Sequence, residues 1–217
     1  MAMAREVHGE PADEFWLDTP LLRAFVADVR ATLECHADDI ARGLEALRPR
    51  FAALLADPHW LPDAYAAVNP SSGMGGGIGQ WLLYRAADRS LSLFSLVVPP
   101  GASTPVHDHL AWGLVGLYRG VQEEVVYRRL DSGGEDTDRA DLQRVAVRRL
   151  EPGDFYTLLP PEGDIHAVTT QSDIPSVSIH LLGNDVGCIW RHAYDPAAGR
   201  VRRFRSGYSN APCPETG

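Results

Sequence analysis

Two histidines separated by a single residue are the strongest chemical signal in the chain. They are His107 and His109, in the sequence PVHDH. On a strand, residues i and i+2 point to the same face, so the two imidazoles are expected to converge inside a barrel. A third histidine, His166, follows the turn sequence PEGD and is expected to enter another strand. Three imidazoles suit iron, zinc, copper or nickel and leave the opposite side open for a substrate, so we predict a metal site.

The part of the chain that carries these histidines has the pattern of strands. From Gln80 onward, short stretches rich in aliphatic, β-branched and aromatic residues alternate with turn sequences such as PPGAST and EPGD. LSLFSLVV and VSIHLL are two of these stretches. Strands at this spacing, without helical patterns between them, predict an antiparallel sandwich or barrel.

The residues before the strands have a helical pattern. Apolar residues recur at three- and four-residue steps between about Thr19 and Asn69, and Pro49 is expected to kink or split the second helix. The glycine-rich residues 71–79 are interpreted as an entrance loop, because no G-K-[ST] follows them as in a phosphate-binding loop. We expect residues 1–69 to form a tail and a helical cap, and residues 70–217 a β-barrel, in one compact unit.

Composition argues against several classes of partner. The chain has 217 residues and a formal net charge of −9, and a negative surface repels nucleic acid. It contains neither an apolar stretch of the ~20 residues that a membrane span needs nor a secretory signal, so we expect a cytoplasmic protein without a membrane partner. The three cysteines, Cys35, Cys188 and Cys213, are odd in number and widely spaced, which predicts no disulfide framework and no zinc site.

The residues around the histidines resemble the two motifs of the cupin superfamily. Gly101 precedes His107 by six residues, and the second segment follows the pattern P-x-G-x-x-H with Pro161, Gly163 and His166. The resemblance implies a mainly β fold, namely a cupin double-stranded β-helix or jelly-roll barrel, here with an N-terminal α-helical cap.

One departure from the cupin pattern points to a particular family within the superfamily. Gly113 stands where most cupins carry a glutamate ligand, which implies a neutral three-histidine site. A three-histidine cupin with H-D-H and this glycine resembles the thiol dioxygenases, that is, cysteine dioxygenase and 3-mercaptopropionate dioxygenase. The resemblance covers roughly residues 70–210.

Four further residues match positions of that family. Ser178 and His180 reproduce its S-x-H element, whose histidine lies close to the iron-bound substrate. Gln80 matches the position that is arginine in cysteine dioxygenases and glutamine in the mercaptopropionate type. Arg191 looks like the arginine that the glutamine type uses for the substrate carboxylate. The alternative reading of Arg191 is an ion pair with an acidic neighbour such as Asp185 or Asp195.

The resemblance implies Fe(II) as the cofactor, although three imidazoles also accept zinc, nickel or another divalent metal. The expected reaction converts a small thiol carboxylate and O2 into a sulfinate, with 3-mercaptopropionate ahead of cysteine. Leu182 stands where the family carries a tyrosine, which leaves open a cupin dioxygenase or isomerase acting on a non-thiol. A metal-holding small-molecule binding protein without turnover is the other alternative.

Overall fold

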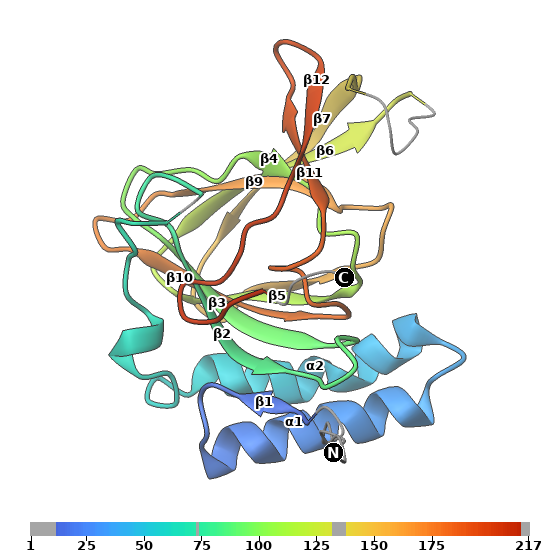
Figure 1. Ribbon diagram of the computed structural model, residues 1–217, viewed down its shortest axis with the longest axis vertical. Coiled ribbons are helices and arrows are strands. Elements are labelled where there is room, and N and C mark those ends of the chain that lie inside the picture. Colours follow the sequence, from blue (N-terminus) through green and yellow to red (C-terminus); the bar gives the residue numbers. More distant parts are fainter. Residues whose placement is uncertain (1–11, 73, 132–137, 214–217) are drawn as a thin grey trace, which may run out of the picture.

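The computed structural model describes residues 12–72, 74–131 and 138–213, which form two α-helices beside two antiparallel β-sheets (Figure 1). The helices are α1 (Pro20–Cys35) and α2 (Ile40–Ala56), followed by the short 3-10 helix η1 (Asp63–Tyr65). The strands are β1 (Glu14–Phe15), β2 (Gly79–Arg85), β3 (Ser92–Val98), β4 (Val106–His107), β5 (Gly113–Arg119), β6 (Gln122–Arg129), β7 (Leu142–Leu150), β8 (Phe155–Leu158), β9 (Ile165–Thr170), β10 (Ser176–Leu182), β11 (Arg191–Asp195) and β12 (Arg200–Phe204).

The two sheets are built by a chain that crosses repeatedly between them. Sheet A has the order β1-β2-β3-β10-β5-β8, and sheet B has the order β12-β11-β4-β9-β6-β7. Strands far apart in sequence therefore become neighbours, as where β10 lies between β3 and β5. This alternation is the jelly roll, the double-stranded β-helix of the cupin fold. The predicted fold class, a mainly β barrel of this kind with a helical N-terminal part, is confirmed.

The two helices begin at side-chain caps and differ from the prediction at one point. Thr19 accepts a hydrogen bond from the first turn of α1, and Asp39 does the same for α2. The expected split of the second helix is wrong, because α2 continues through Pro49. Leu44, on one side of the proline, and Phe51, on the other, are both fully buried, so packing outweighs the lost backbone hydrogen bond. Within the described ranges, no helix is long and apolar enough to cross a membrane.

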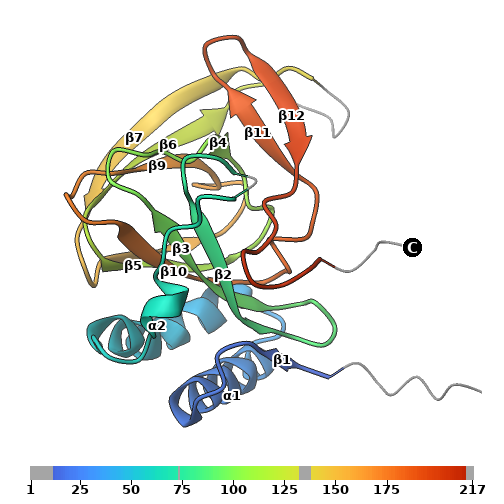
Figure 2. The same ribbon diagram turned by 60° about the vertical axis from the view of Figure 1, so that its left-hand side comes forward.

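The largest core cluster lies between the helices and the outer face of sheet A. It joins apolar residues of α1 and α2, such as Leu22 and Phe51, to sheet residues such as Leu93 and Ile179. Figures 1 and 2 show both helices on the sheet A side, so that sheet B faces away from them. A fully buried leucine of this kind contributes roughly 1.5–3 kcal/mol. The helical part thereby supports sheet A, while the barrel interior is left for the histidines.

The cysteines also differ from the prediction. Cys188, in the connection between β10 and β11, forms a disulfide with Cys213 near the C-terminus, and Cys35 is free and exposed. The pairing requires the chain after β12 to return to the edge of sheet A, which the spacing of cysteines along the sequence does not reveal.

Candidate metal centre

Three histidine side chains meet inside the barrel. His107, at the end of β4, lies directly opposite His166 on β9, and His109 follows two residues after the strand. The ring centroids form a nearly equilateral triangle, with separations of 4.9, 5.0 and 4.9 Å. One nitrogen from each ring lies within 4.8 Å of the others, and all three residues are buried. The predicted convergence is therefore present.

His109 reaches this position in a different way from the one predicted. Strand β4 ends at His107, so alternation along a strand does not direct the His109 ring. Instead, the two carboxylate oxygens of Asp164 accept hydrogen bonds from the backbone N–H groups of His109 (2.9 Å) and Leu110 (3.2 Å). Leu110 has a φ of 53°, so the chain turns sharply here. The turn aims the His109 ring at the other two.

Asp108 anchors the same loop from the outer side. Its carboxylate accepts hydrogen bonds from the backbone and the ring Nδ1 of His192, and from the hydroxyl of Tyr194. Both partners belong to β11. The residue between the two histidine ligands is thus fixed by carboxylate contacts to the neighbouring strand, a role that the sequence did not reveal for Asp108 or His192.

Hydrogen bonds at the ring Nδ1 atoms set the orientation of two of the histidines. The His107 Nδ1–H donates to the Pro105 carbonyl at 2.9 Å, and the His166 Nδ1–H donates to Glu124 Oε1 at 2.7 Å. Each ring therefore has its Nε2 lone pair available for a metal. Burial, with smaller contributions from neighbouring histidines, lowers the pKa of His107 and His109 well below the usual value. Such neutral imidazoles are the form that binds metal.

Glu124 is a supporting residue that sequence reasoning missed. It is fully buried on β6, and besides His166 its carboxylate accepts a hydrogen bond from Arg148 at 3.2 Å. Burial by itself raises the pKa of Glu124, but the contacts of its carboxylate with His166, Tyr156 and Arg148 together hold this pKa below its ordinary value. A glutamate at an inward position of a strand was the available signal. The carboxylate of Glu124 therefore contacts the histidine His166 and is not itself one of the three candidate metal ligands.

Replacing Glu124 with glutamine is expected to weaken metal retention about 10- to 100-fold, because the substitution removes the carboxylate that orients His166. The measurement is competition for zinc between the protein and a chelator. Glu123→Gln, the next residue along β6 and less buried, is the matched control and should retain metal like the wild type. Equal retention by both variants would show that Glu124 does not support the site.

The backbone around Gly113 explains why no carboxylate completes the group from that position. A Cβ atom placed on Gly113 would lie 2.0 Å from the backbone oxygen of Leu181 on β10, so no side chain fits there. Among the described residues, the histidine trio is the one group of three or more side chains positioned to hold a metal. Three neutral nitrogen donors suit a divalent ion such as iron or zinc.

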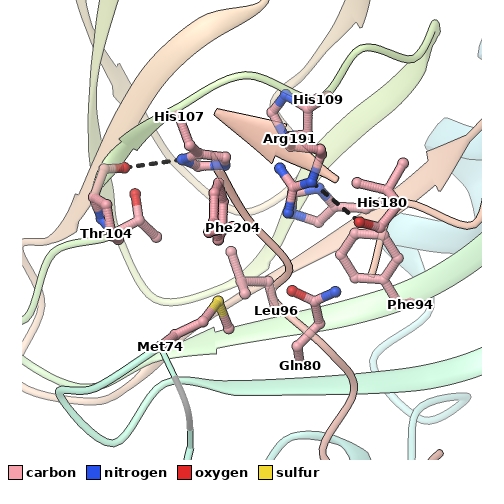
Figure 3. A pocket seen from close by; sticks show the side chains of 12 residues that line it. Met74, Gln80, Phe94, Leu96, Thr104, His107, His109, His180, Arg191 and Phe204 are labelled. Carbon is pink, nitrogen blue, oxygen red and sulfur yellow. Dashed lines mark hydrogen bonds between the residues drawn. The ribbon is translucent and has the colours of Figure 1, made fainter. Parts of the chain in front are cut away.

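A pocket opens onto His107 and His109 and contains about 370 Å³ of empty space, its mouth included. Figure 3 shows an apolar wall of Met74, Leu96 and Phe204, with the side-chain amide of Gln80 beside Leu96 and the guanidinium of Arg191 above it, next to His109. Met74 belongs to the glycine-rich segment that was interpreted as an entrance loop.

Arg191 is a buried cation without an acidic partner among the described residues. Its Nε donates to the Val186 carbonyl at 3.1 Å, its Nη1 to the Asp108 carbonyl, and its Nη2 to Ser206 Oγ at 2.9 Å. Burial lowers the pKa of Arg191 to about 10, so the guanidinium still carries its charge at neutral pH.

The alternative reading of Arg191 as an ion-pair partner of Asp185 or Asp195 is wrong. Asp185 instead contacts Arg85 and Arg89. Asp195 accepts hydrogen bonds from two backbone N–H groups in the turn after β11. The charge of Arg191 is therefore left facing the pocket.

The other predicted site residues also border the pocket or support its wall. Ser178 Oγ lies 2.9 Å from His180 Nε2, and the His180 ring stacks on Phe94 with a centroid separation of 4.7 Å. Burial lowers the pKa of His180 well below its usual value. The Nδ1 of His180 and the Nε2 of Gln80 are buried without a hydrogen-bond partner in the described structure. Buried polar atoms of this kind usually have a partner, so a ligand is expected to supply one.

Leu182, which replaces the family tyrosine, lies in the apolar core of the barrel. It is packed in one cluster with Phe94, Leu96 and Val115. This position therefore supplies no hydroxyl group to the pocket.

Comparison with known proteins gives no family for the chain. No protein-family model matches the chain. The chain is similar to peruvianin-I, a cysteine peptidase from Thevetia peruviana latex, with 20% identity, a TM-score of 0.42, and coverage of 60% of this chain and 74% of that chain. Recombinant oxalate oxidase in complex with glycolate matches at 18% identity and a TM-score of 0.40 over 55% and 56% of the two chains. A cupin 2 conserved barrel domain protein from Salinispora arenicola matches at 19% identity and a TM-score of 0.37 over 52% and 82%.

These likenesses concern the fold. Taken on its own strand order and side chains, the protein is a jelly-roll barrel of the cupin type with a three-histidine group that can hold a metal ion.

Proposed function

We propose that the protein is an iron-dependent thiol dioxygenase that oxidises a small mercapto-acid, such as 3-mercaptopropionate, to its sulfinate. The reaction is R–SH + O2 → R–SO2H, in which sulfur loses four electrons and dioxygen gains them. The observation that carries the proposal is a buried guanidinium, that of Arg191, with no acidic partner in the described structure, in the pocket onto which His107 and His109 open.

Arg191 is suited to bind the carboxylate of the substrate. An arginine has five N–H donors, and the three hydrogen bonds to Val186, Asp108 and Ser206 use three of them. The remaining two allow a bidentate contact with a carboxylate. A buried charge without a counter-ion is costly, so an acidic ligand would be favoured over a neutral one. The unpartnered amide nitrogen of Gln80 offers a further donor to the same ligand.

A bound Fe(II) would supply the positive charge that stabilises a thiolate and the place where thiolate and dioxygen meet. The protein's own groups do the rest. Because no side chain fits at Gly113, no carboxylate from that position could join the three histidines. Three neutral imidazoles would leave the positive charge of a bound metal without compensation from an anionic ligand. Neutral His180, held by Ser178 and stacked on Phe94, is positioned to accept a proton or to hold a water molecule beside the ligand. The apolar wall limits the entry of further water.

The proposal is tested by loading the protein with Fe(II) without oxygen, adding one thiol at a time, and following oxygen uptake. The panel contains 3-mercaptopropionate, cysteine and the neutral 2-mercaptoethanol. We expect the fastest uptake with 3-mercaptopropionate, because cysteine adds an ammonium group near the Arg191 charge and 2-mercaptoethanol lacks the carboxylate.

Two other outcomes would contradict the proposal. Oxygen uptake with non-thiol acids alone would favour a different dioxygenase on the same barrel. A thermal shift on addition of acids, without uptake for any compound, would favour a metal-holding binding protein.

A further inference from the structure

The chain after β12 forms a strap, defined here as residues 206–213, that connects two sides of the pocket. Figures 1 and 2 show it running from β12 down to the β2 side of sheet A. Its contacts reach β2 on one side and the connection between β10 and β11 on the other. Gln80 lies on β2, and Arg191 is the first residue after the connection, at the start of β11.

On the β2 side, the strap takes the place of a neighbouring strand. The Ser209 N–H donates to the Gln80 carbonyl at 2.6 Å, and the Gln80 N–H donates to Ser209 Oγ at 3.1 Å. The side-chain amide of Asn210 makes a similar pair of bonds with the backbone of Leu82, both at 2.9 Å. Strand β1 covers β2 only at Tyr84 and Arg85. The backbone at Gln80 therefore depends on the strap.

On the other side, the strap holds Arg191 and the residues that precede it. Ser206 Oγ accepts a hydrogen bond from Arg191 Nη2, and the Gly207 N–H donates to the Gly187 carbonyl at 2.8 Å. The Tyr208 hydroxyl accepts from the Gly187 N–H at 3.1 Å. A Cβ atom on Gly187 would lie 2.5 Å from the Tyr208 ring, so a glycine is needed for this close contact.

A disulfide fastens the end of the strap. Cys213 is its last residue, and Cys188 lies three positions before Arg191. Hydrogen bonds alone would hold such a segment weakly, because water competes for each of them. The histidines, in contrast, are held by Pro105, Asp164 and Glu124, which lie outside the strap.

We propose that the strap, closed by the Cys188–Cys213 disulfide, positions Arg191 and Gln80 for an acidic ligand, so that opening it weakens acid binding and leaves metal binding unchanged. Ser206 acts through Arg191 and is therefore a positioning residue. This proposal rests on the proposed function for its choice of an acidic ligand.

The test compares the Cys188→Ser/Cys213→Ser double variant with Cys35→Ser, which removes the free, exposed cysteine. The probe is 3-hydroxypropionate, which keeps the carboxylate and cannot exchange with a disulfide, and its Kd is measured by calorimetry on the zinc-loaded full chain. We expect the double variant to raise the Kd at least about fivefold, because fewer molecules have both groups in place. Zinc affinity should change less than about twofold, and Cys35→Ser should match the wild type.

A phosphine reductant provides the same comparison on the wild type. With one water molecule, which supplies the oxygen and the two protons, it converts the disulfide into two thiols and is itself oxidised to the phosphine oxide, and we expect the same rise in Kd. An unchanged Kd in the double variant, or a parallel loss of zinc, would overturn the proposal. Ser206→Ala keeps the disulfide and should raise the Kd about threefold. If circular dichroism shows that the double variant does not fold, Ser206→Ala decides: a raised Kd supports the proposal, and an unchanged one overturns it.

The proposed function can fail separately. If the wild type forms no sulfinate but its Kd for 3-hydroxypropionate depends on the disulfide, the proposed role of the strap is supported and the proposed dioxygenase activity is wrong. If the wild type forms sulfinate and every variant has the same Kd for 3-hydroxypropionate, the proposed dioxygenase activity is supported and the proposed role of the strap is wrong.

Discussion

Replacing His107 with alanine is expected to remove metal binding, with a loss of affinity greater than about 100-fold. Loss of an outer partner of a metal ligand already costs about 10- to 100-fold, and His107 is itself one of only three donors. The measurement is metal content per chain after loading with Fe(II) and gel filtration. Oxygen uptake with 3-mercaptopropionate should disappear with the metal.

His59→Ala is the matched control for this substitution, because His59 is an exposed histidine outside the barrel interior. It should bind metal like the wild type. Full metal content in His107→Ala would mean that the three rings do not form the site, whatever their separation.

Replacing Arg191 with alanine is expected to leave metal content unchanged and to raise the KM for 3-mercaptopropionate about 10- to 100-fold. A hydrogen bond to a charged group contributes roughly 1.5–3 kcal/mol, and this substitution would remove the proposed bidentate contact. The measurement is the dependence of oxygen uptake on thiol concentration. Arg191→Lys should recover part of the affinity, because it restores the charge without the planar donor fork.

Two comparisons separate the loss of this contact from general damage to the pocket. Turnover of neutral 2-mercaptoethanol should be the same in Arg191→Ala and the wild type. Arg203→Ala, at an exposed position on the neighbouring strand β12, should leave both substrates unaffected. An unchanged dependence on mercapto-acid concentration in Arg191→Ala would show that the assignment of Arg191 is wrong.

The barrel and its histidines were predictable because their signals are local. Alternating apolar residues and turn sequences predicted most strands of both sheets, and the spacing of His107, His109 and His166 predicted their convergence. The short strand β1 and the hairpin of β11 and β12 were not predicted, since two residues carry no period and the arginines of β12 look like a solvated edge. The local sequence pattern was therefore sufficient to predict the barrel and its three histidines.

What remained hidden depends on contacts between distant segments. Glu124 reaches His166 because β6 pairs with β9, and Asp164 reaches the backbone of His109 because β9 pairs with β4. The disulfide depends in the same way on the return of the strap to Cys188. No periodicity marks these pairs, because each is set by how the strands cross. Even His109, correctly named as part of the trio, is directed by a carboxylate and not by a strand.

The most direct test of the account is the fate of isotopically labelled dioxygen. The Fe(II)-loaded protein is supplied with 3-mercaptopropionate and ¹⁸O₂, and the product is analysed by mass spectrometry. We expect a sulfinate that carries two ¹⁸O atoms, formed by the wild type and not by His107→Ala. Oxygen uptake that yields only the disulfide of the thiol, or a sulfinate whose oxygen comes from water, would contradict it.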